Sequence, residues 1–165
     1  MWINHSWSVL AIVFIVGVQE YLSPYLVHYV GSREPFGIQP QPGVVRLSED
    51  TRWRFAGLQA FRWFLRSEFS EENLAFWLAC QDYRSSPESR LAEKASSIYT
   101  QFINPDAPQE VNLDSETRDA LMCVMDEPAT NMFDEAQQRI YCLMAKDSFP
   151  RFLRSPYCRS TLRAL

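Results

Sequence analysis

Apolar residues between positions 47 and 165 recur at the spacing of α-helices. The stretch "SEENLAFWLACQDY" places Leu74 and Trp77 on one face of a predicted helix, and Phe76 and Cys80 on another. Apolar residues on two faces are typical of a helix enclosed in a bundle. No stretch alternates polar and apolar residues for long enough to make a strand. The pattern therefore predicts an all-α fold of antiparallel segments joined by short loops.

Local signals predict where the first helices begin and end. Ser70 is expected to be an N-cap whose hydroxyl accepts from the amide of Asn73. The helix that follows ends at "SSPES", because Ser86 precedes a proline and is pushed away from the α region. A second helix is expected from Leu91 to Ile103, and "NPDAP" at 104–108 has the composition of a loop.

The remaining helices are predicted in the same way. Asp114 or Ser115 caps a shorter helix that "DEPAT" breaks, and a long helix begins near Phe133. Ser148 is expected to start a fresh helix, because Pro150 would then lie in the first turn, where its missing N–H does no harm. A last helix closes the chain through Tyr157.

Residues 1–46 differ in kind from the rest. Residues 9–18 form a ten-residue apolar run, which is short of the about 20 residues that span a bilayer. No Lys or Arg precedes Arg33, so the basic start of a secretory signal is missing. Residues 32–43 are a Pro/Gly-rich linker. We expect residues 7–30 either to associate with a membrane or to fold back on the domain formed by 47–165.

Composition and charge exclude several classes of function. The net charge is −4, and all of it falls in 47–165, which argues against nucleic-acid binding. The only histidines are His5 and His28, and no glycine follows Gly57. Histidine-based catalysis, a phosphate-binding glycine loop and a histidine-containing metal site are therefore not expected in the domain. The four cysteines have no close pair and no metal-ligand spacing, which suggests reduced, mostly buried thiols: Cys80, Cys123, Cys142 and Cys158. We expect no cofactor.

Three stretches resemble the RGS domain, the helical module that regulates heterotrimeric G-protein signalling. They are "FLRSEFSEENLAFWLAC", "IYTQFINPDAPQEVNLDSETR" and "FDEAQQRIYCLMAKDSFPRFLRSPYC", in the order and spacing of that family. The resemblance implies a four-helix bundle and a smaller lobe of terminal helices. It also implies a GTPase-activating protein for Gα subunits that supplies no catalytic residue of its own and has no cofactor.

The resemblance also implies which positions contact Gα. By correspondence with the family, Asn112 reaches the catalytic glutamine and a switch threonine of Gα in its GTP-bound or transition-state form. Each such position also has an ordinary structural interpretation: Ser70, Asn73 and Asp114 as caps, Leu143 as core, and Asp147 with Arg151 as a helical ion pair. The full set is Glu68, Ser70, Glu72, Asn73, Asn112, Asp114, Leu143, Asp147, Ser148 and Arg151.

Two alternatives accompany this prediction, and the sequence departs from the family in two places: in the pattern that opens the domain and in residues 1–46, which match no part of it. The chain could be an RGS-like scaffold without activity towards GTP hydrolysis, or an unrelated helical protein. The family's opening Trp and paired leucines are not reproduced in "RLSEDTRWRFAGLQAFRWFL", so we expect an incomplete terminal lobe. The resemblance places the domain in the cytoplasm, and the apolar segment suggests the cytoplasmic face of the plasma membrane.

Overall fold

The structure is a computed structural model that describes the backbone of residues 49–164 and the side chains of 56–161 and 163. The predicted apolar segment at 7–30 and the linker at 32–43 lie outside these residues. Among the described helices, none combines the length and the apolar character that a membrane span requires. The described residues form helices, turns and loops without a strand, which confirms the all-α prediction.

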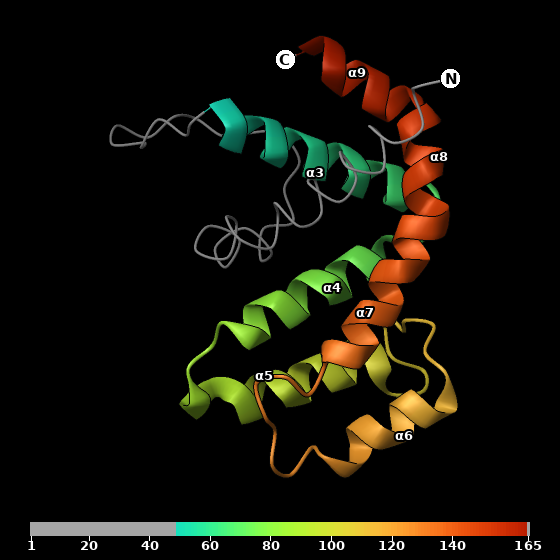
Figure 1. The fold of residues 1–165 in the computed structure, drawn as a ribbon. Coiled ribbons are helices and arrows are strands. Elements are labelled where there is room, and N and C mark those ends of the chain that lie inside the picture. Colours follow the sequence, from blue (N-terminus) through green and yellow to red (C-terminus); the bar gives the residue numbers. More distant parts are fainter. Residues whose placement is uncertain (1–48, 165) are drawn as a thin grey trace, which may run out of the picture.

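The larger part of the fold is a bundle of helices (Figure 1). Its central member is α4, which packs against α3, α5 and α7. As predicted, α4 buries both of its apolar faces, including Phe76 and Tyr83. The helices of the bundle are α4 (Glu71–Arg84), α5 (Leu91–Ile98), α6 (Ser115–Cys123) and α7 (Asp134–Leu143), with a short 3-10 turn at Glu88–Arg90 before α5 and a π-helical turn at Tyr99–Ile103 after it.

One continuous helical rod connects the bundle to the other end of the molecule (Figure 1). It consists of α7, a π-helical turn at Met144–Ser148 and α8 (Phe149–Arg154). The prediction of a fresh helix start at Ser148 is therefore wrong. Ser148 has the helical φ −64° and ψ −40° and makes no side-chain cap. Pro150 cannot donate to the helix ladder, and a π-helical turn just before it lets the rod continue.

Aromatic side chains hold the terminal helices together. α3 (Glu49–Ser67) packs on α9 (Pro156–Ala164) and on α8. The Phe61 ring centre lies 5.2 Å from that of Phe152 and 5.6 Å from that of Phe149. The ring of Phe64 meets Tyr157 edge-on at 6.2 Å. The described part of the terminal lobe is therefore made by α3, α8 and α9, while residues 1–48, which precede it, are outside the described part.

Buried polar contacts fix α4 against its neighbours. The Gln137 Nε2 of α7 donates to the Trp77 carbonyl at 2.9 Å, and the Tyr83 hydroxyl donates to the Ala129 carbonyl at 2.8 Å. All four cysteines are free thiols, as predicted, but only Cys80 and Cys158 are buried. Cys123, the last residue of α6, is exposed and Cys142 is partly exposed, which corrects the expectation of mostly buried thiols.

Two residues of α7 differ sharply in exposure, and this predicts different costs of truncation. Ile140 is 1% exposed, whereas Leu143, one turn further on, is 39% exposed. We expect Ile140→Ala to lower the free energy of unfolding by about 2–5 kcal/mol, because it removes buried methylene groups and leaves a cavity. Leu143→Ala is the matched control, with an expected loss below about 1 kcal/mol. Urea unfolding measures both, and equal losses would contradict the described orientation of α7.

Candidate functional site

The corner between α3 and α4 carries the first predicted contact residues. The chain reverses at Phe69, whose φ is 55°, and the amide of Ser70 donates to the Leu65 carbonyl at 3.0 Å. Ser70 occupies the N-cap position, but its hydroxyl makes no cap and lies 3.4 Å from the Leu65 carbonyl instead. The predicted bond to the amide of Asn73 is therefore wrong. With ψ 26°, Ser70 is outside the extended conformation that a capping serine normally takes.

Asn73 lies just inside α4 and is 7% exposed. Its Nδ2 donates to Glu72 Oε1 at 3.0 Å and approaches the Ser70 carbonyl at 3.4 Å. Its Oδ1 is buried and has no hydrogen-bond partner among the described residues. Partial burial raises the pKa of the Glu72 carboxyl. The side-chain amide of Asn73 thus connects the corner to α4, and Glu72 is the more exposed residue of the two.

The second segment, residues 110–114, is held by its apolar members and presents its polar ones. Val111 and Leu113 are buried, whereas Asn112 between them is exposed. Asp114 is the N-cap of α6, as predicted, and its Oδ1 accepts from the Thr117 amide at 2.9 Å. This hydrogen bond, more than the nearby Arg139, lowers the pKa of the Asp114 carboxyl.

The third segment, residues 143–151, runs from the end of α7 through the π-helical turn into α8. Leu143 and Asp147 are exposed there, so the interpretation of Leu143 as a core residue does not hold. Ser148 points inward and is 5% exposed. Leu143 and Asp147 are therefore available to a partner, and the side chain of Ser148 contributes to packing.

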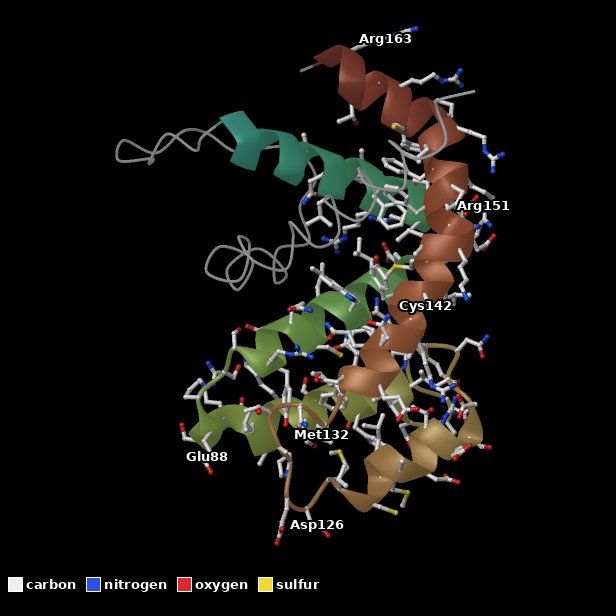
Figure 2. All side chains as sticks on the ribbon, in the orientation of Figure 1. Glu88, Asp126, Met132, Cys142, Arg151 and Arg163 are labelled. Atoms are coloured by element: carbon white, nitrogen blue, oxygen red, sulfur yellow. The ribbon has the colours of Figure 1, made fainter. Side chains whose placement is uncertain are left out.

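Arg151 joins the first segment to the third. Its Nη2 and Nε lie 2.6 and 3.3 Å from the two carboxylate oxygens of Glu68, and its Nη1 pairs with Asp147. The predicted pair with Asp147 is confirmed, and the pair with Glu68, far away in the sequence, is new. The hydrogen bonds to Glu68 and then to Asp147 raise the pKa of Arg151. Figure 2 shows Arg151 standing on the rod, away from the end of the molecule where Asp126 lies.

Two further residues belong to this surface but were missed in the sequence. Phe69 is 93% exposed, and its positive φ is uncommon for a bulky residue. Its only signal in the sequence is an aromatic residue inside the polar string "SEFSEE". Arg139 of α7 pairs with Asp114 at 2.6 Å and with Glu135 at 2.9 Å, so it ties the second segment to the rod.

The predicted residues therefore form three segments that α7 and α8 connect. The corner at 68–73 is tied to the rod through Arg151, and residues 110–114 are tied to it through Arg139. Asn73 and Ser148 are buried, while the other predicted residues are at least partly exposed. Among the described residues, no group of three or more His, Cys, Asp or Glu side chains is arranged to hold a metal ion.

Comparisons with known proteins agree on one family. The family model described as "Regulator of G protein signaling domain" matches residues 53–160. The chain is 58% identical over 101 residues to human regulator of G-protein signaling 21, a match that covers 61% of this chain and 66% of that protein. It is 47% identical to pig regulator of G-protein signaling 5, covering 71% of this chain and 70% of that protein, and 45% identical to rat regulator of G-protein signaling 8, covering 71% and 72%. The chain thus spans just under two thirds of the human relative.

The lowered pKa of Asp114 predicts a pH dependence of stability. A carboxyl whose folded pKa lies below its unfolded value of about 3.9 stabilises the fold above that pH, and this contribution is lost as the pH falls through the folded pKa. Asp114→Asn keeps a capping side chain but does not titrate. We expect the variant to lose less stability than the parent between about pH 4 and pH 2.

Thermal unfolding across this pH range measures the difference. Asp119→Asn, on an exposed position of the same helix, is the matched change of charge. Parallel acid profiles for the parent and Asp114→Asn would contradict the assigned role of Asp114.

Proposed function

Because this chain belongs to the regulator of G protein signaling (RGS) domain family, we propose that it is a GTPase-activating protein for the α subunits of heterotrimeric G proteins. The observation that carries the proposal is the linkage of the three predicted contact segments through one helical rod. Glu68, Asp147 and Arg151 come from the first and third segments and share one set of ion pairs. Three contact segments held in fixed positions suit the binding of a large partner protein that is contacted at several places at once.

The chemistry of such a partner makes a catalytic side chain from the regulator unnecessary. Gα carries its arginine in cis and a glutamine that orients the attacking water. A protein that holds these groups in their reactive positions speeds hydrolysis by binding the transition state more tightly than the ground state. In this proposal the domain acts through binding alone and supplies no catalytic residue.

The exposed side chains of the three segments match this task. Asn112 offers an amide that both donates and accepts hydrogen bonds, and it stands on a loop whose neighbours are buried. Leu143 and Phe69 add exposed apolar surface next to polar groups, a combination typical of interface centres. Because these side chains sit on packed elements, little ordering is required on binding.

A comparison of nucleotide states tests the proposal. We expect the domain to bind Gα most tightly when GDP is combined with a planar phosphoryl mimic, and more weakly with GDP alone or with a non-hydrolysable GTP analogue. A partner that binds all states equally shifts no equilibrium. Equal affinities together with unchanged single-turnover hydrolysis would leave the chain as a scaffold rather than an activator.

The substitution Asn112→Ala tests the centre of the proposed surface. We expect a loss of about 1–3 kcal/mol in activation, or about 5- to 150-fold, because a polar contact made at the interface is removed. Thermal stability is expected to change little, since Asn112 is exposed. Single-turnover GTP hydrolysis by Gα measures the effect.

Met122→Ala, at an exposed position of α6 outside the three segments, is the matched control and should retain full activity. Unfolding of the Asn112 variant, or full activity in it, would remove Asn112 from the proposed surface.

A further inference from the structure

The loop around Asn112 is held without any contribution from Asn112 itself. Its side chain is exposed and makes no hydrogen bond within the part of the chain that the structure describes. The amide of Val111 donates to the Phe102 carbonyl at 2.9 Å, and the amide of Leu113 donates back to the Val111 carbonyl at 3.0 Å. The second bond closes a three-residue turn with Asn112 at its tip. Such a turn is tight, but it alone does not fix the direction in which the tip points.

Arg118 of α6 donates hydrogen bonds to residues on both sides of this turn. Its Nη1 donates to Glu110 Oε1 at 2.8 Å, and its Nη2 donates to the Leu113 carbonyl at 3.3 Å. These two partners lie on either side of Asn112 in the sequence. The Nε of Arg118 is buried and has no hydrogen-bond partner among the described residues. The guanidinium is therefore buried at Nε and hydrogen-bonded through Nη1 and Nη2, which leaves it little freedom to move.

Arg139 anchors the end of the same loop to the rod. Its Nη1 lies 2.6 Å from Asp114 Oδ2, and its Nη2 lies 2.9 Å from Glu135 Oε1 on its own helix. Asp114 is at the same time the cap of α6, so it belongs both to the loop and to the helix that carries Arg118. The loop is thus fixed to α6 by one arginine and to α7 by another.

We propose that Arg118 and Arg139 are positioning residues for the activation of GTP hydrolysis, acting through the placement of Asn112. This inference rests on the proposed function, and it assigns roles to two residues outside the predicted contact set. Neither side chain needs to touch the nucleotide or the catalytic groups of Gα. The strength of a contact to a transition state depends steeply on geometry. If the loop that carries Asn112 is displaced, the rate of GTP hydrolysis falls although Asn112 itself is unchanged.

Arg118→Met tests this role with little risk to the fold. Methionine keeps an unbranched apolar side chain at this position and removes the donors to Glu110 and Leu113. The buried Nε without a partner disappears with them, so the substitution creates no new buried polar atom in the side chain. The matched control is Arg84→Met, which breaks the pair between Arg84 of α4 and Asp134 of α7, away from the Asn112 loop. Arg139→Met forms a third arm.

The central measurement is a double-mutant cycle in single-turnover GTP hydrolysis by Gα. We expect Arg118→Met and Arg139→Met each to lower activation by about 3- to 30-fold, and Arg84→Met to leave it within about 2-fold of the parent. Combined with Asn112→Ala, Arg118→Met should add little further loss, because the contact that it positions is already gone. Arg139→Met also releases Asp114, a second proposed contact residue, and should add a smaller loss than it causes alone. Affinity for the transition-state form should fall more than affinity for the GDP form.

Hydrogen exchange gives a readout that does not depend on activity. The amide of Leu113 should exchange faster in Arg118→Met than in the parent, while amides within α4 remain protected. Rescue by Arg118→Lys is expected to be partial, since one ammonium group cannot reproduce the two-sided fork of the guanidinium.

Each contrary outcome has a distinct meaning. Full additivity with Asn112→Ala, or activity equal to the Arg84→Met control, would overturn the inference and leave the proposed function intact. If Asn112→Ala itself is fully active, there is no contact to position and the inference is overturned as well. If the parent activates no Gα, the proposed function fails, and unchanged exchange at Leu113 would then overturn the positioning role separately.

Discussion

The helical rod at 134–154 holds the two parts of the fold in place, because it belongs to both of them. Its first half packs on α4 and buries Ile140, and its second half carries Phe149 and Phe152 into the aromatic cluster with α3. A break in the rod would let the two parts move relative to each other. The π-helical turn at Met144–Ser148 keeps it continuous across a proline. Loops attached to this rod therefore keep fixed relative positions.

Arginines attach those loops to the helical framework. Arg151 pairs with Glu68 of the α3–α4 corner, Arg139 pairs with Asp114, and Arg118 spans the Asn112 turn. Each pair is at least partly open to solvent, and pairs of this kind contribute little to the free energy of folding. Their effect lies in geometry, because the planar guanidinium fixes the direction of two partners at once. The fold is stabilised mainly by its buried apolar side chains, and the ion pairs set the orientation of the surface.

The sequence predicted well the features that depend on helix periodicity and loop composition, and one of the predicted caps. The burial of both faces of α4, the loop at 104–108 and the cap at Asp114 follow from residue spacing and composition. The predictions that failed depend on tertiary context. Ser70 and Ser148 have the sequence of caps, but Ser70 follows a positive-φ Phe69 and Ser148 continues a π-helical turn. The pair of Glu68 with Arg151 joins residues far apart in the chain, and no local pattern reveals such a contact. The contact positions themselves came from family resemblance, since periodicity alone indicates only a helical domain.

In the proposed mechanism, this surface is formed before a partner arrives. A crystal structure of the domain bound to Gα in its transition-state form, compared with the free domain, would test this. We expect residues 68–73, 110–114 and 143–151 all to lie in the interface and their backbone to move by less than about 1 Å on binding. A partner seated over a different face, such as the cavity between α6 and the start of α7, would contradict this expectation. A rearranged Asn112 loop in which Arg118 has released Glu110 and Leu113 would contradict it as well.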